Sequence, residues 1–167
     1  PQEHYHVDIF FDKLEFSHDI FFGSKPGKGR LELDNPTITL SDLFLEKTQI
    51  HEINEKDIKD LIVLLRAHDI GKEDKRQIIN VKYISNILAD DWGFWHDVKL
   101  NLSKVNLFAN QYHKRDLLSA EDLMDVKNKI DLLLKYIDEA PKTKRWVKRA
   151  KKGTNKCWWR KVEEVVR

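Results

Sequence analysis

The chain has 167 residues, of which 41% are hydrophobic and 35% charged, and its formal net charge is +2. This composition is that of a folded domain with a packed core and excludes a largely disordered chain, while the longest apolar runs are too short to span a bilayer, so we expect no membrane partner. The one cysteine, Cys157, excludes an intrachain disulfide and a cysteine-based zinc site and favours a reducing cytoplasmic location.

The first part of the chain carries strand patterns. Residues 5–11 alternate between an apolar face and a face that holds Asp8, which predicts a strand with a carboxylate at its centre. A second strand is predicted over residues 14–22, a turn or loop over 23–29 and a third, short strand over 30–33.

The rest of the chain is predicted to be helical. Thr39 followed by Asp42 resembles a capping box, Asn54 is a second cap, and Ser119 followed by Asp122 marks a later helix start. The expected helices cover residues 40–51, 54–67, 74–89, 92–112, 119–139 and 143–151, with a last one near 156–166. A short β-region followed by a long α-region is an α+β fold, with a boundary between residues 1–70 and residues 71–167.

Asp8 stands out because a carboxylate within an apolar strand loses hydration and needs a cation, a metal or a hydrogen-bond donor. It either lies in water on an edge strand or binds a divalent cation beside a cleft, and the residues alone leave both interpretations open. His4 and His6 share its face. Three residues on one short strand seldom converge on one ion, so a transition-metal site is not our prediction.

Two further patterns resemble phosphate or metal sites without meeting their requirements. The segment GSKPGKGR, residues 23–30, has three residues between its first two glycines and no Lys-Ser or Lys-Thr pair, so it predicts a basic turn rather than a phosphate-binding loop. The His-Asp dipeptide occurs at His18-Asp19, His68-Asp69 and His96-Asp97. A metal-dependent phosphohydrolase needs several such residues on one ion, and single pairs arise by chance in a chain with seven histidines.

Residues 142–161 form the clearest charge asymmetry, with ten basic residues, no acid and three interleaved tryptophans. One interpretation is tryptophans in the core and lysines in solvent. Because an ordinary solvated face mixes both signs, we predict instead a surface for polyanions such as nucleic-acid phosphates. Its residues are Lys144, Arg145, Lys148, Arg149, Lys151, Lys152 and Arg160.

Three segments, taken in order, resemble the nucleotidyltransferase superfamily with a DNA polymerase beta-type fold. They are VDIFFDKLEFSHDI, GRLELDNPTITLSDLFLEKTQI and NEKDIKDLIVLL. The nearest resemblance is to uncharacterised prokaryotic nucleotidyltransferase-like proteins in the neighbourhood of AbiEii-type toxins. The later segments DDWGFWHDVKLNL and PKTKRWVKRAKKGTNKCWWRKVEE are similar to the helical C-terminal part of the same group. Residues 1–70 would then be a partial nucleotidyltransferase-like region.

The resemblance implies a magnesium-dependent transfer of a nucleotide from an NTP to an acceptor, and the basic end favours RNA, including tRNA, as that acceptor. In that superfamily a Gly-Ser motif and two alternating acids hold two magnesium ions, and a third acid on a later strand completes the site. Asp8 matches the third acid, which would bind metal and help to activate the acceptor hydroxyl. Lys47 matches a lysine that contacts nucleotide phosphates, although most lysines of amphipathic helices are simply solvated. Lys56, Asp57 and Asp60 match a Lys-Asp…Asp pattern with a supporting or structural role, for which acids in a first helical turn also suffice.

The sequence departs from the superfamily pattern at its start. Only seven residues precede Asp8, they contain no Gly-Ser and no Asp-x-Asp, and Gly23-Ser24 comes after Asp8. With one acid of three, the chain alone is not expected to assemble a two-metal site. Three alternatives stay open: the catalytic segment lies upstream of Pro1, as we expect; a partner supplies it; or the chain is a non-catalytic module of the same ancestry that binds nucleic acid or a protein.

Overall fold

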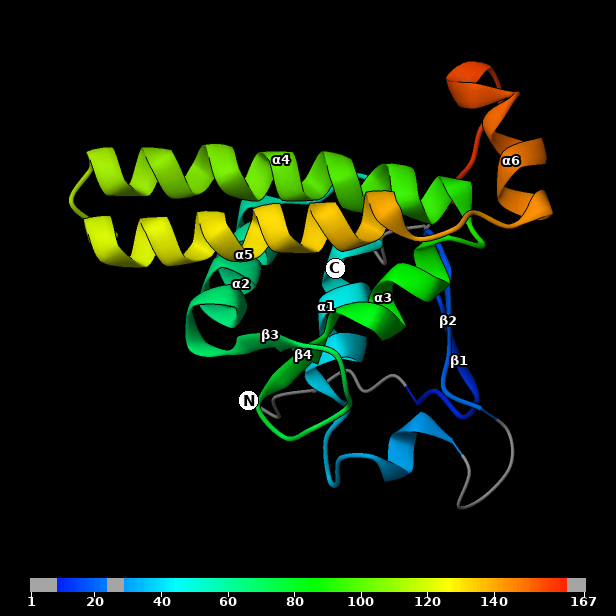
Figure 1. Ribbon diagram of the computed structural model, residues 1–167, viewed down its shortest axis with the longest axis horizontal. Helices are drawn as coiled ribbons and strands as arrows, with labels where there is room; N and C mark the ends of the chain where they lie inside the picture. Colours follow the sequence, from blue (N-terminus) through cyan, green and yellow to red (C-terminus); the bar gives the residue numbers. More distant parts are fainter. Residues whose placement is uncertain (1–8, 24–28, 162–167) are drawn as a thin grey trace, which may run out of the picture.

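The structure is a computed structural model, and it describes residues 9–23 and 29–161 (Figure 1). Within these residues the chain forms six α-helices and two small sheets of two strands each, so the predicted α+β class is confirmed. The helices are α1 (Leu40–Thr48), α2 (Glu55–Ala67), α3 (Val81–Leu88), α4 (Trp92–Lys114), α5 (Ala120–Glu139) and α6 (Lys144–Ala150). The strands are β1 (Lys13–Glu15) and β2 (Asp19–Phe21), which pair antiparallel, and β3 (Asp69–Gly71) and β4 (Ile78–Asn80), which pair parallel.

Side-chain caps explain why several helices begin where the sequence predicts. The Thr39 hydroxyl accepts a hydrogen bond from the Asp42 N–H at the start of α1, and the Asn54 side chain accepts one from the Asp57 N–H at the start of α2. Ser119 does the same before α5. Each cap satisfies a backbone donor that a helix leaves without an internal partner, so the polar residue fixes the first turn.

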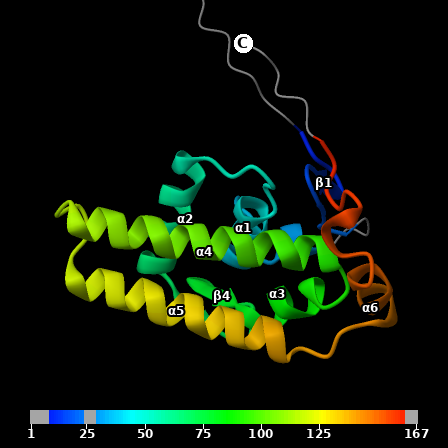
Figure 2. The same cartoon turned by 90° about the horizontal axis from the view of Figure 1, so that it is seen from above.

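Two long helices dominate the arrangement. Figure 1 shows α4 and α5 running side by side along the molecule, with α1, α2 and α3 packed beneath them. Seen from above in Figure 2, α6 lies beyond the end of this helical pair, and the red segment that follows α6 runs beside β1. The basic C-terminal part of the chain is thereby placed at the N-terminal end of α4.

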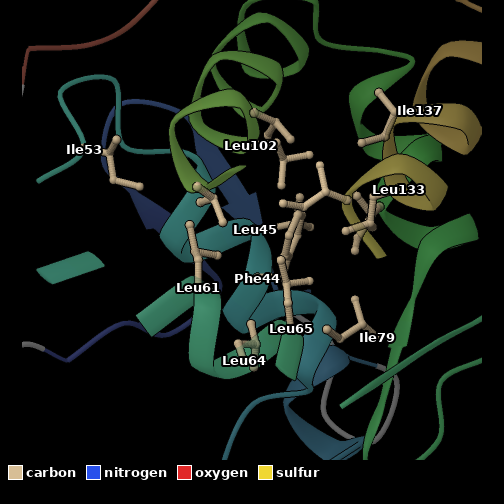
Figure 3. Close-up of a cluster of buried hydrophobic side chains, with 14 of the residues drawn as sticks. Phe44, Leu45, Ile53, Leu61, Leu64, Leu65, Ile79, Leu102, Leu133 and Ile137 are labelled. Atoms are coloured by element: carbon tan, nitrogen blue, oxygen red, sulfur yellow. The ribbon is translucent and has the colours of Figure 1, made fainter. Parts of the chain in front are cut away.

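The core is one continuous cluster of buried side chains (Figure 3). Phe44 and Leu45 of α1 are fully buried at its centre, against Leu61 of α2 and Leu102 of α4, and Leu133 of α5 is likewise fully buried in the same cluster. Each such side chain contributes roughly 1.5–3 kcal/mol through removal from water. Side chains from both sides of residue 70 therefore share the same core.

The strand predictions were partly wrong. The segment 14–22 is not one strand but a hairpin in which Leu14 pairs with Ile20, because residues 16–18 turn inward and place His18 in the interior. Residues 9–12 contain no strand, and residues 5–8 lie outside the described residues.

The third predicted strand is a short 3-10 turn, Arg30–Glu32, whose arginine reaches α1.

Two helix predictions were also corrected. Within the segment 74–89, residues 74–77 form a loop and turn and β4 follows. The chain becomes helical only at Val81, because the Asn80 side chain accepts the N–H groups of Lys82 and Tyr83 and caps α3 there. The final predicted helix is absent over residues 156–161, where the Trp158 side chain turns toward α4; its remainder lies outside the described residues. Among the helices of residues 9–23 and 29–161, none combines the length and apolarity needed to cross a membrane.

Candidate functional site

A buried carboxylate joins three distant parts of the chain. Asp97, on the inward face of α4, is 1% exposed. Its Oδ2 lies 2.7 Å from Nε2 of His18 in the hairpin turn, and its Oδ1 lies 3.0 Å from Nδ1 of His51, which follows α1. The indole N–H of Trp158 donates to the same Oδ1 at 2.9 Å. One carboxylate thus connects the hairpin, the end of α1 and the C-terminal segment.

The hydrogen bonds keep Asp97 ionised and determine which ring nitrogens of the two histidines face it as donors. Burial acts to raise the pKa of Asp97, but the hydrogen bonds from His18, Trp158 and His51 outweigh it and lower that pKa. Because an ionised carboxylate only accepts hydrogen bonds, the ring nitrogens that face it must carry protons. A neutral His18 is therefore protonated at Nε2, with Nδ1 left as a base, and a neutral His51 at Nδ1, with Nε2 left as a base.

The C-terminal strap, residues 156–161, is packed tightly against this cluster. Trp159 stacks on the His51 ring with 3.7 Å between ring centroids. A Cβ at Gly93 would lie 2.8 Å from the carbonyl oxygen of Trp158, so only glycine permits this approach. Arg160 donates to Asp19 at 2.9 Å and to the carbonyl of Phe16 at 3.1 Å. The strap is thus bound to both α4 and the hairpin.

A groove of about 630 Å³ opens beside the cluster, between the β1–β2 hairpin, α3 and the strap. His18 and Trp158 line it together with the aromatic rings of Phe21, Tyr83 and Phe94. Its charged residues pair with each other: Arg160 with Asp19, and Arg145 with Asp90 at 3.2 Å. The groove therefore combines apolar walls, neutralised charges and an imidazole held by a carboxylate.

The predicted basic surface is present, but its members differ in what they contact. The arginines bind the protein itself: Arg145 pairs with Asp90, Arg160 with Asp19, and Arg149 donates to the carbonyls of Gly153 and Lys156. Lys142 bonds the carbonyls of Ile137 and Ala140 at the end of α5, and burial lowers its pKa. Six lysines have no side-chain partner within the described residues and are exposed: Lys144, Lys148, Lys151, Lys152, Lys156 and Lys161.

The lysine and acids singled out by the resemblance come together between α1 and α2. The Lys47 ammonium lies 2.9 Å from Asp57 and 3.0 Å from Asp60, and these hydrogen bonds outweigh its partial burial and raise its pKa. Lys56 is exposed on α2 and contacts none of these three residues. The trio holds the two helices together, and contact of Lys47 with nucleotide phosphates stays a prediction.

Asp8 lies outside the described residues, so the structure places it neither in a strand nor at a metal. Within residues 9–23 and 29–161, no three His, Cys, Asp or Glu side chains are arranged to hold a metal ion. A magnesium site that includes Asp8 stays a prediction.

A second buried polar group fixes the start of α1. Both carboxylate oxygens of Asp42 lie within 2.8 Å of Arg30 Nε, and the Tyr83 hydroxyl donates to the same carboxylate at 2.8 Å. The Arg30 guanidinium lies 3.3 Å from the centroid of the Tyr83 ring. Burial, followed by the Asp42 charge, raises the pKa of Tyr83 and keeps it neutral. Every member is paired, so this group serves the fold.

The sequence pointed to single His-Asp dipeptides but not to the pairs that form. His18 meets Asp97, which belongs to a different dipeptide, and His51 belongs to none of them. One signal was available: Asp97 lies three residues after the apolar Phe94, on the face of the helix that becomes buried. An acid on the apolar face of a helix needs partners, although the sequence does not say which.

Comparisons of this chain with protein-family models, with curated proteins and with solved structures return no match.

Proposed function

We propose that this chain binds nucleic acid through phosphate contacts made by the basic face, defined as Lys144, Lys148, Lys151, Lys152, Lys156 and Lys161. The observation that carries the proposal is that these six exposed ammonium groups have no partner in the described part of the chain. No acid interrupts them in the sequence. Cations that neutralise phosphates release counterions from nucleic acid, which supplies most of the free energy of non-specific binding.

The local distribution of positive charge supports nucleic-acid binding better than the net charge of the chain does. The net charge of the whole chain is only +2, too small to attract a polyanion at every face. The unpaired cations instead gather on α6 and the strap at one end of the molecule (Figure 1). Such a patch orients a polyanion as well as attracting it.

Charge reversal on the basic face should weaken binding strongly. The double variant Lys148→Glu/Lys152→Glu loses two phosphate contacts and adds repulsion, so we expect its dissociation constant for a labelled RNA hairpin to rise by roughly 10–100-fold in 0.1 M salt. Fluorescence anisotropy measures this directly. The matched control is Lys114→Glu/Lys127→Glu, which makes the same change in net charge on α4 and α5, away from α6. Equal losses for the two double variants would reject the basic face as the binding surface.

A specific observation also favours the transferase proposal, in which this chain is the acceptor-binding part of a magnesium-dependent nucleotidyltransferase-like protein. Lys47 contacts both Asp57 and Asp60, and the resemblance singles out all three residues. Their proximity in the fold supports the resemblance, which rests on the order of the motifs that contain them. In this proposal the basic face holds an RNA acceptor, and Asp8 and acids from outside this chain bind magnesium and the NTP.

The transferase proposal predicts NTP-dependent labelling. With magnesium, RNA and NTPs labelled on the α-phosphate, we expect the chain together with the segment that precedes it to label RNA, and Asp8→Ala to abolish that labelling because charge stabilisation at the metals is lost. Asp12→Ala removes an exposed acid nearby and serves as the matched control. Labelling that survives Asp8→Ala would eliminate this role for Asp8 and leave the binding function intact.

A further inference from the structure

We propose that the basic face recognises double-helical nucleic acid by its phosphate backbone and does not read bases. The inference rests on the proposed nucleic-acid binding and adds the class of nucleic acid that is bound. It follows from how the fold uses two kinds of side chain that often read bases, arginines and open aromatic rings.

Each arginine of this region has a partner within the described residues. Arg145 pairs with Asp90 at 3.2 Å, and Arg160 pairs with Asp19 at 2.9 Å. Arg149 donates to two backbone carbonyls, at 2.9 and 2.6 Å. The arginine fork is the usual reader of the guanine edge, whereas a lysine ammonium acts as a point charge on phosphate. Among the described basic residues from Lys142 to Lys161, only lysines have no protein partner, so phosphate contact is favoured over base contact.

The tryptophan rings are committed as well. Trp92 stacks on His96 with 5.0 Å between centroids, and the Arg149 guanidinium lies 4.8 Å from the same ring. Trp158 meets neighbouring rings edge to face and donates its N–H to Asp97. Trp159 has one face on His51. Proteins that bind single strands stack bases on open aromatic faces. Among the described tryptophans of this region, Trp159 has one face without a stacked ring, and Trp146 of α6 meets Trp95 only edge to face at 5.2 Å.

The free lysines suit the charge density of a double helix. Lys144 and Lys148 are one helical turn apart and lie on the same side of α6, and Lys151 and Lys152 continue from its end. A duplex presents one phosphate charge per roughly 1.7 Å of its axis, about twice the linear density of one strand. A rigid row of ammonium groups therefore gains more from a duplex than from a flexible single strand.

The test compares duplex and single-stranded probes of equal length with the full chain. We expect 16-base-pair DNA and RNA duplexes to bind at least about fivefold more tightly than their separate strands, with less than about twofold variation among three unrelated sequences. The plot of log K against log salt should lose about one unit of slope in Lys148→Ala, and no more than a small fraction of that in the control Lys114→Ala. Trp159→Ala should leave the affinity within about twofold.

Tryptophan fluorescence of the unaltered chain gives a second readout, which does not depend on a variant folding correctly. Backbone contact predicts little quenching on duplex binding, whereas a base stacked on Trp159 would quench strongly. Tighter binding of single strands, strong quenching, or tenfold differences between sequences would each overturn backbone recognition while preserving nucleic-acid binding. Absence of binding to every probe would instead reject the proposed function itself.

Discussion

Asp97→Asn is expected to lower the free energy of unfolding by about 3 kcal/mol, because it removes the charge at the centre of a buried hydrogen-bonded cluster. In the native chain His18, His51 and Trp158 all donate to this carboxylate. An amide keeps one acceptor oxygen and replaces the other with an NH₂ group, so the histidine that meets this group must change its tautomer or face another donor. The loss is measured by urea unfolding followed by circular dichroism at 222 nm.

Asp97 is also expected to make the free energy of unfolding depend on pH. The pKa of Asp97 is lowered in the folded chain, whereas an unfolded aspartate titrates near about 3.9. A group with a lowered folded pKa contributes stability above its unfolded pKa and loses it as the pH falls through the folded one. The stability difference between the unaltered chain and Asp97→Asn should therefore be largest near pH 7 and smaller at pH 3.

A matched control is available at Asp116, in the turn between α4 and α5. It is exposed, has no side-chain partner among the described residues, and sits at φ 57°, a left-handed conformation that asparagine tolerates as well as aspartate. Asp116→Asn is expected to change the free energy of unfolding by less than about 0.5 kcal/mol. If Asp97→Asn behaved like this control, the cluster would not contribute to stability as the distances indicate.

Local features of the sequence predicted the starts of α1, α2 and α5, whereas contacts between distant residues defeated the prediction for residues 14–22. Thr39, Asn54 and Ser119 mark helix starts by themselves, because a cap acts within a few residues. The hairpin in residues 14–22 was missed because its turn is fixed from outside: the His18 N–H donates to Gln49 and the ring to Asp97. Strands β3 and β4 were missed because each has only three residues.

In the basic segment, too, the local sequence features could be predicted and the contacts with distant residues could not. Its lack of acids is visible in the sequence and predicts a polyanion surface. The sequence does not show that Arg145 and Arg160 are paired with Asp90 and Asp19, since those acids come from other parts of the chain. The prediction treated arginines and lysines as equivalent, whereas among the described residues of this segment only lysines have no partner. Because of that difference, we propose a surface that binds the phosphate backbone of nucleic acid rather than a general surface for polyanions.

Asp42→Asn should also destabilise the chain by about 3 kcal/mol, because it leaves Arg30 without its closest carboxylate at a buried position. Asp74→Asn is a matched control, since Asp74 contacts the same guanidinium at 3.2 Å but is 28% exposed in its side chain. A solvent-accessible pair of this kind is worth less than about 1 kcal/mol. Urea unfolding of both variants compares a buried and an exposed carboxylate on one arginine.

Tyr83→Phe separates the two contacts of Tyr83, the hydrogen bond of its hydroxyl to Asp42 and the packing of its ring against Arg30. The variant removes the hydroxyl that donates to Asp42 at 2.8 Å but keeps the ring beneath the Arg30 guanidinium. We expect a loss of about 1 kcal/mol, the usual net value of one hydrogen bond to a buried acceptor that retains other donors. Similar losses for Asp42→Asn and Asp74→Asn would mean that burial does not strengthen the pair. A loss in Tyr83→Phe as large as that in Asp42→Asn would mean that the hydroxyl, rather than the arginine, holds the start of α1.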